Sequence, residues 1–462
     1  MTDKQGDLTA VAKIPRLERR AKTPFFRVPA SFDASTVLPL HLQRRGDDAR
    51  WFLDTIVRKM AHNETDDYGY ARLHCAIIRR VMSRRDHPAV VRCLVDGKWI
   101  DAPAPYCVGI KSKGYRLGSG HLDERCRLVP AEDPHIIARI HREWERMRAE
   151  QMNRWLPIHQ ELCRVQQALT ILPEADAVLD GLRDDTRLCQ HVLVENIRSQ
   201  DFAFTLSSTG RVFNAITGLK RELRKTLRLA GETIGGVDIC CTQPALLAVL
   251  MGGILNQNVP TYIQSAVGRP LFIPSPVPLL CRAPTLLGLP SSWKCGPQPG
   301  ADFDFFRSLV LDGSLYDHLV SLCSGAGIFL APPERESVKK AVLRDFLAKR
   351  GCYPCAFEDA FRTAFPSVHR FVRWVNREDH ATLIRLLQRF ESWLVIESVA
   401  PRLIGRIPVI TLHDAIYSRA RDIQVVEDAF AETFCDLGIS LRVKAETCAP
   451  AGKEVTKCTL TN

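Results

Sequence analysis

Long apolar runs are missing from this sequence. No stretch approaches the roughly 18 to 20 uncharged apolar residues that a membrane-spanning helix needs, and the first thirty residues carry no apolar signal core. Acidic residues in that segment, Asp3, Asp7 and Glu18, argue against an organelle transit peptide. We therefore expect a soluble, cytoplasmic protein, in a bacterial or a viral or plasmid-borne context.

Cysteine pairs at metal-like spacing are also scarce. The sixteen cysteines do not form a small-domain disulfide pattern, so we expect them to be reduced, buried or metal-bound. Only Cys352 and Cys355 have CxxC spacing, and no second CxxC or CxxH pair follows at a usual distance. Ordinary thiols are favoured over structural zinc at this pair.

Positive charge is plentiful. Lys and Arg number 63 against 52 Asp and Glu, which gives a net charge of +11 and favours polyanionic partners, nucleic acid first. With 462 residues and 46% hydrophobic content, the chain is long enough for two or three folded domains.

The first half of the chain predicts a tail followed by helices. Residues 1–45 are basic and predict a flexible tail. In 46–130, helices at 70–80 and about 90–95 precede a basic hairpin at 99–117, a pattern typical of a winged-helix-like nucleic-acid module, although a structural appendage explains it almost as well. Asp133-Pro134 begins a helix in the mostly helical region 131–204.

Asp238 ends an apolar, strand-like run. Pro244 suits the first turn of a helix that continues through Leu246 and Leu250. Asp238 therefore stands where a strand stops and its carboxylate can reach a metal ion.

Asp414 occupies a similar place, at the turn between two short strands. The elements predicted around it are strands at 407–412 and 415–418, a helix from Asp422 to Gly438 and a strand over 439–443. This order predicts an α+β fold, a small antiparallel sheet backed by helices, with Asp414 beside Asp238. Two such aspartates can hold two Mg²⁺ ions, with Mn²⁺ as an alternative, for phosphoryl transfer.

Basic helices accompany the aspartates. Arg335 and Lys339 stand four residues apart, hence on one helical face, and can hold a triphosphate. Lys220, Arg224 and Arg228 also fall at helical spacing, a plausible track for a nucleic-acid backbone. Prolines interrupt residues 256–300, which we interpret as an insertion.

In this order, the blocks of residues 205–462 resemble the palm and fingers of family A DNA polymerases and the related single-subunit, phage-type RNA polymerases. The matching segments are Thr209-Gly210-Arg211 with the TGR segment, Asp238 with motif A, Arg335 and Lys339 with the RxxxK of the fingers helix, Gln388 in Leu387–Glu391 with the glutamine segment, and His413-Asp414 with the HD of motif C.

The resemblance implies a right-hand polymerase architecture, with 131–204 as a thumb-like region. It implies that Asp238 and Asp414 bind metal and act in catalysis with Lys339. Residues implied to bind the nucleotide are Arg335, Lys339, Gln243 and Phe346; those implied to contact primer-template DNA are Arg211, Lys220, Arg224, Arg228, Gln388 and His413.

Departures from the family pattern keep alternatives open. Gln243 stands where the DNA enzymes carry a glutamate that helps exclude ribonucleotides, and Ala415 follows the motif C aspartate. Phe346 stands one place before the expected aromatic, and the first 200 residues lack a convincing set of exonuclease carboxylates, so proofreading is not expected.

The leading hypothesis is a DNA polymerase of a mobile element or phage-like replicon. An RNA polymerase or primase, with RNA as a further candidate partner, remains the alternative in the same class, and a non-catalytic replication initiator is the alternative from another class. An HD-type phosphohydrolase is disfavoured, because His413-Asp414 stands in a predicted hairpin.

Overall fold

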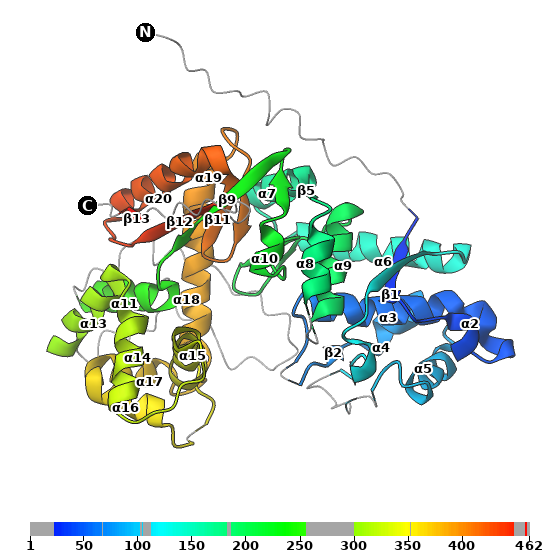
Figure 1. Cartoon of the computed structure of the whole chain (residues 1–462), viewed down its shortest axis with the longest axis horizontal. Helices are drawn as coiled ribbons and strands as arrows, with labels where there is room; N and C mark the ends of the chain where they lie inside the picture. Colours follow the sequence, from blue (N-terminus) through cyan, green and yellow to red (C-terminus); the bar gives the residue numbers. More distant parts are fainter. Residues whose placement is uncertain are drawn as a thin grey trace, which may run out of the picture. The chain divides into compact units, whose positions relative to one another are not determined.

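Residue contacts divide the chain into two units. The computed structural model describes residues 23–66, 68–101, 104, 112–182, 186–255, 300–351, 353–447 and 458–459. Unit 1 comprises Met1–Thr205, Phe213–Ile234 and Cys448–Gly452, and unit 2 comprises Leu206–Val212, Gly235–Thr447 and Lys453–Asn462. The chain is a mixed α+β protein with small antiparallel sheets (Figure 1).

Unit 1 begins with strand β1 (Phe25–Pro29), which corrects the tail predicted over residues 1–45. β1 pairs antiparallel with β4 (Cys126–Pro130), and Arg27 within it is only 1% exposed. Its guanidinium lies 2.6 Å from the Asp201 carboxylate. The buried apolar residues Phe26 and Val28 and the ion pair of the buried Arg27 hold the segment in the fold, while residues 1–22 lie outside the described part.

Helices make up most of unit 1. The helix α6 begins after Asp133, whose carboxylate accepts from the His135 backbone N–H at 2.8 Å, as the Asp-Pro pair predicts. The helical elements are α2 (Ala34–Val37), η1 (Leu40–Arg45), α3 (Gly46–Ala61), α4 (Cys75–Val81), α5 (His87–Asp96), η2 (Ser119–His121), α6 (Pro134–Met152), α7 (Pro157–Val165), η3 (Gln166–Ala168), α8 (Ala175–Gly181), α9 (Arg187–Arg198) and α10 (Arg221–Arg224).

The helix predicted over 70–80 is wrong at its start. Ala71–Arg72 forms strand β2, which pairs with β3 (Gly114–Tyr115), and α4 begins only at Cys75. Tertiary pairing overrides local helix propensity here. The centre of the predicted winged-helix hairpin, 105–111, lies outside the described residues.

The division into units differs from the boundary predicted at residue 205, because residues 213–234 belong to unit 1. There β8 (Leu227–Leu229) pairs with β5 (Leu169–Ile171) and with the first residues of β9 (Glu232–Ile239). From Gly235 onward, β9 belongs to unit 2.

The sheet of unit 2 has the strand order β10-β11-β9-β12-β13. Its further strands are β10 (Ile410–Leu412), β11 (Ala415–Arg419), β12 (Val443–Thr447) and β13 (Cys458–Thr459). The hairpin around Asp414 is confirmed, because Leu412 pairs with Ala415. The strand predicted over 439–443 is wrong: β12 begins at Val443, after Gly438 ends α20 with φ 62°.

Helices accompany this sheet, and Figure 1 shows α18 (Thr382–Ser392) running between the strands and a group of helices that includes α14 to α17. The remaining helical elements of unit 2 are α11 (Thr242–Leu255), α13 (Ala301–Asp312), α14 (Leu315–Gly325), α15 (Glu334–Ala341), the π-helical η5 (Val342–Leu347), α16 (Ala356–Ala364), α17 (Pro366–Val375), the π-helical η6 (Trp393–Val399), α19 (Ala400–Leu403), η7 (Ala420–Asp422) and α20 (Ile423–Leu437).

Two expectations drawn from composition, on membrane-spanning helices and on the cysteines, concern the described residues. None of the helices described there combines the length and the apolar character needed to cross a bilayer. Cys355 of the predicted CxxC pair is a free thiol, whereas Cys352 and most of the predicted insertion, 256–299, lie outside the described part.

Candidate active site

Asp238 and Asp414 lie close together in the unit 2 sheet, the first within a strand and the second in the turn before the neighbouring strand. Asp238 is the penultimate residue of β9, and Asp414 stands in the two-residue turn that leads into β11, the neighbour of β9. The Ile239 backbone N–H donates to the Asp414 carbonyl oxygen at 3.3 Å. The fold therefore brings the two residues together as the strand pattern predicts, and their metal-binding role stays a prediction.

Burial and like charge act on this pair. Burial first, and then the neighbouring Asp414 carboxylate, raises the pKa of Asp238 to about 6, whereas the ammonium groups of Lys444 and Lys339 act in the opposite direction. Lys444 is the register partner of Asp238 on β12. The two carboxylates carry negative charge that a further cation would stabilise.

Thr242, the first residue of α11, contacts Asp414. Its buried hydroxyl lies within hydrogen-bonding distance of an Asp414 carboxylate oxygen and 2.7 Å from the Ile239 carbonyl oxygen. Cys241 makes the turn before it with φ 50°, a conformation that non-glycine residues seldom adopt. The start of the helix after Asp238 thus also orients Asp414.

Arg335 and Lys339 of α15 are part of the same electrostatic environment. Burial raises the pKa of the Cys241 thiol, the charges of Arg335 and Lys339 oppose this rise, and Lys339 also acts on Asp238. Arg335 Nη1 lies 2.5 Å from Asp317 and Lys339 Nζ 2.6 Å from Glu336. Their side chains keep 42% and 38% of their surface exposed, so an anionic ligand can reach both.

Glu391 of α18 is a buried carboxylate at the centre of a second cluster. Arg211 donates to it through Nε at 2.9 Å and Nη2 at 2.7 Å, and Gln243 donates through Nε2. Burial raises the pKa of Glu391 to about 7, with Asp414 adding to the rise and Arg211 opposing it. The guanidinium of Arg211 is engaged in an ion pair within unit 2, and its contact with nucleic acid stays a prediction.

The loop before Arg211 is held against α18. It joins the short strands β6 (Thr205–Leu206) and β7 (Val212–Phe213). Gly210 has φ 81°, a backbone conformation that residues with a side chain rarely adopt, so glycine is favoured there. The Thr209 hydroxyl lies 3.5 Å from Gln388 Oε1, and Gln388 therefore borders this loop.

His413 stands beside Asp414 in the β10–β11 turn. Its φ of 54° is the left-handed conformation that two-residue hairpin turns require. The structure thus explains its backbone, and its contact with a primer terminus stays a prediction.

Other predicted site residues do not join this constellation. The helical track of Lys220, Arg224 and Arg228 is wrong, because α10 ends at Arg224 and Arg228 lies on strand β8, all within unit 1. The structure places Phe346 in the core, and its predicted contact with the nucleotide stays a prediction. That side chain is 1% exposed and its ring packs against Phe361 with centroids 4.0 Å apart.

The donor set for a metal ion is small. Among the described residues, no group of three or more His, Cys, Asp or Glu side chains could hold a metal ion. Asp238 and Asp414 would supply two carboxylates, which suits Mg²⁺, an ion that is usually held by one or two carboxylates with waters and substrate phosphates as its other ligands.

The sequence patterns gave no role to Glu391 or Thr242. Glu391 carried a readable signal, because it lies next to the apolar stripe Leu387, Phe390 and Leu394 that runs from α18 into η6, where a carboxylate needs a buried partner. Thr242 carried none, because its partner Asp414 is distant in the chain.

Comparisons with known proteins found no matching family model and no matching curated protein. Among solved structures, the chain is similar to the POL domain of Pol1 from M. smegmatis in complex with DNA primer-template and dNTP, with 12% identity and a TM-score of 0.26. The match covers 59% of this chain and 49% of that one, so the chain spans about half the length of this neighbour. The function is therefore inferred from the residues of the site.

Proposed function

We propose that this chain is a template-directed nucleotidyltransferase, and specifically a DNA polymerase that extends a 3′-hydroxyl. One observation supports the proposal above all: two aspartates close together in the unit 2 sheet share an electrostatic environment with a helix that presents Arg335 and Lys339. Nucleotidyl transfer needs this combination, anionic ligands for metal ions next to cations for a polyphosphate.

Asp238 and Asp414 would hold Mg²⁺, or Mn²⁺ in its place. The raised pKa of Asp238, about 6, fits this role, because a buried carboxylate beside another is stabilised in its charged form by a cation. Such an ion supplies charge stabilisation at the attacking oxygen and at the leaving pyrophosphate.

The other side chains would bind and orient the nucleotide. Arg335 offers a planar fork of donors and Lys339 a compact charge, so together they would hold the triphosphate. Lys339 would also give a proton to the leaving pyrophosphate. Gln243, fixed by its donation to Glu391, would border the incoming nucleotide, and His413 would meet the primer terminus.

Primer extension tests this proposal directly. The full chain is incubated with a labelled primer on a DNA template and Mg²⁺, with dNTPs and NTPs in parallel reactions. Asp414→Asn is expected to lower the extension rate by more than about a hundredfold, because it removes an anionic metal ligand. The control is Asp428→Asn, an exposed aspartate of α20 in the same unit, which should extend at the wild-type rate.

The outcomes separate the alternatives. Extension only with NTPs would replace the DNA polymerase by an RNA polymerase or primase, the alternative that Gln243 and Ala415 keep open. If the wild-type chain binds DNA but adds nothing from either pool, with or without a primer, the transferase proposal is wrong and a replication initiator takes its place.

A further inference from the structure

Tyr316 of α14 lies beneath two cations of the neighbouring helix α15. The Arg335 guanidinium carbon is 5.6 Å from the centroid of its ring, and the Lys339 ammonium nitrogen is 5.8 Å from the same centroid. Burial raises the pKa of Tyr316, with the charge of Asp414 among the further causes. The ring is therefore neutral, and it belongs to the same environment as the aspartate pair.

Two like charges lie close to the same ring only where another interaction offsets their repulsion. Arg335 and Lys339 stand four residues apart on α15, where like charges repel. An aromatic face attracts cations within about 6 Å of its centroid, so a single ring offsets part of this repulsion. Each cation also has a carboxylate partner, but Asp317 and Glu336 are 64% and 53% exposed, so water competes with both ion pairs.

We propose that Tyr316 is a positioning residue that gathers Arg335 and Lys339 into one polyphosphate-binding site. The ligand is the triphosphate of a nucleotide, and this part of the inference rests on the proposed function. The ring holds the two cations side by side before the ligand arrives, so less side-chain entropy is lost on binding. Asp317 and Glu336 are the internal counter-ions that the polyphosphate displaces.

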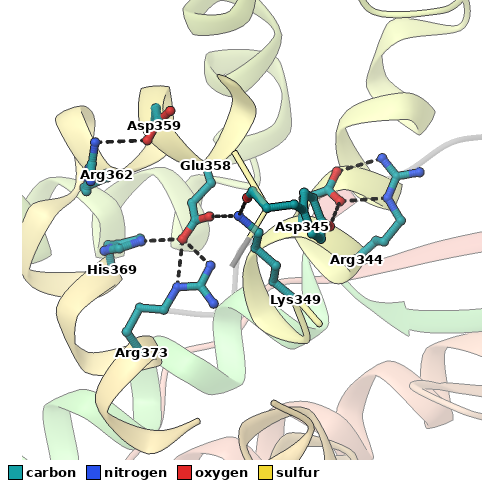
Figure 2. Close-up of polar contacts among 9 residues, drawn as sticks. Arg344, Asp345, Lys349, Glu358, Asp359, Arg362, His369 and Arg373 are labelled. Atoms are coloured by element: carbon teal, nitrogen blue, oxygen red, sulfur yellow. Dashed lines mark hydrogen bonds and ion pairs between the residues drawn. The ribbon is translucent and has the colours of Figure 1, made fainter. Parts of the chain in front are cut away.

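A second cation–tyrosine pair in unit 2 supplies a matched control. The Lys349 ammonium lies 4.4 Å from the centroid of the Tyr353 ring. Lys349 is only 5% exposed and is already bound by Glu358, as Figure 2 shows, so no ligand can use its charge. Replacing Tyr353 by Leu therefore removes a tyrosine ring beside a cation, as Tyr316→Leu does, but outside the proposed site.

The experiment measures binding of inorganic tripolyphosphate to the full chain by calorimetry. Tyr316→Leu is expected to raise Kd about fivefold to tenfold, whereas Tyr316→Phe, which keeps the ring, should stay within about twofold of wild type. Tyr353→Leu should leave Kd unchanged. Equal binding by Tyr316→Leu and wild type, equal weakening by Phe and Leu, or no tripolyphosphate binding by wild type would each overturn the inference.

Two further measurements separate positioning from folding and from the proposed function. In a Lys339→Met background, Tyr316→Leu should lose much of its effect on Kd, and an undiminished effect would mean that the ring acts only on folding. In primer extension, Tyr316→Leu should raise KM for the nucleotide and leave kcat within about twofold. If wild type binds tripolyphosphate with this ring dependence yet extends no primer, the proposed function fails and the phosphate site stands.

Discussion

Unit 2 contains two clusters in which basic side chains, carboxylates and a tyrosine ring meet, and they differ in access. In the Glu358 cluster, Lys349, His369 and Arg373 all donate to one carboxylate, and Lys349 is 5% exposed (Figure 2). In the Tyr316 cluster, Arg335 and Lys339 have separate carboxylate partners and stay about two-fifths exposed, at 42% and 38%.

The difference in exposure indicates that the same residue types serve two roles. Charges that are buried with their partners cannot be released without a large desolvation cost, so the Glu358 cluster holds α16, α17 and the segment that follows η5 together. Exposed ion pairs contribute only about 0–1 kcal/mol, so a polyphosphate can replace them at little cost. Access, rather than residue type, separates a structural cluster from a candidate binding site.

The largest effect is expected from Glu358→Gln. This change leaves the buried Lys349 ammonium without a charged partner, which should lower the free energy of unfolding by about 3–5 kcal/mol. Urea denaturation of the full chain measures the loss. The control is Asp359→Asn, the next residue, whose ion pair with Arg362 is about 60% exposed on both sides (59% and 60%) and visible in Figure 2. A loss as large in the control would contradict the comparison.

A second prediction concerns pH. Burial and then Asp414 raise the pKa of Asp238 to about 6, so the folded chain binds more protons than the unfolded chain from about pH 4 to pH 6, and stability falls as pH rises through this range. In metal-free buffer, Asp238→Asn should therefore raise the free energy of unfolding by about 1–3 kcal/mol at pH 7 and by almost nothing at pH 4.

Glu358 has the opposite sign and is the internal reference for this measurement. Burial raises its pKa, but donation from Lys349, His369 and Arg373 outweighs burial and lowers it to about 2. Its contribution is present above about pH 4.5 and is lost as pH falls toward 2. Urea denaturation at pH 4, 5.5 and 7.5 compares both variants with wild type, and a gain in Asp238→Asn that does not change with pH would contradict the assignment.

The smallest effect on stability is expected from Asp317→Asn. Its ion pair with Arg335 is exposed, so the free energy of unfolding should change by less than about 1 kcal/mol. Since Arg335 then loses an internal competitor, tripolyphosphate should bind about twofold to fivefold more tightly. Calorimetry measures the gain. Weaker binding by Asp317→Asn would mean that this carboxylate orients Arg335 and does not compete for it.

Local patterns predicted the elements around the aspartates well. The hairpin at Asp414 and the helix end at Gly438 follow from alternation and from glycine's tolerance of positive φ, both of which act within a few residues. Local patterns were insufficient where a distant partner decides the outcome. Ala71–Arg72 pairs with a strand more than forty positions further along the chain, and the Phe346 ring packs in the core against Phe361.

By itself, the sequence determined which segments form strands and helices around Asp238, Asp414, Arg335 and Lys339, because periodicity and turn chemistry are short-range properties. Only the tertiary structure decided which charges are buried and which are shared. It placed Arg211 on Glu391 and both cations of α15 over Tyr316. Burial and distance set the strength of electrostatic interactions, and neither is encoded in the spacing of residues along a chain.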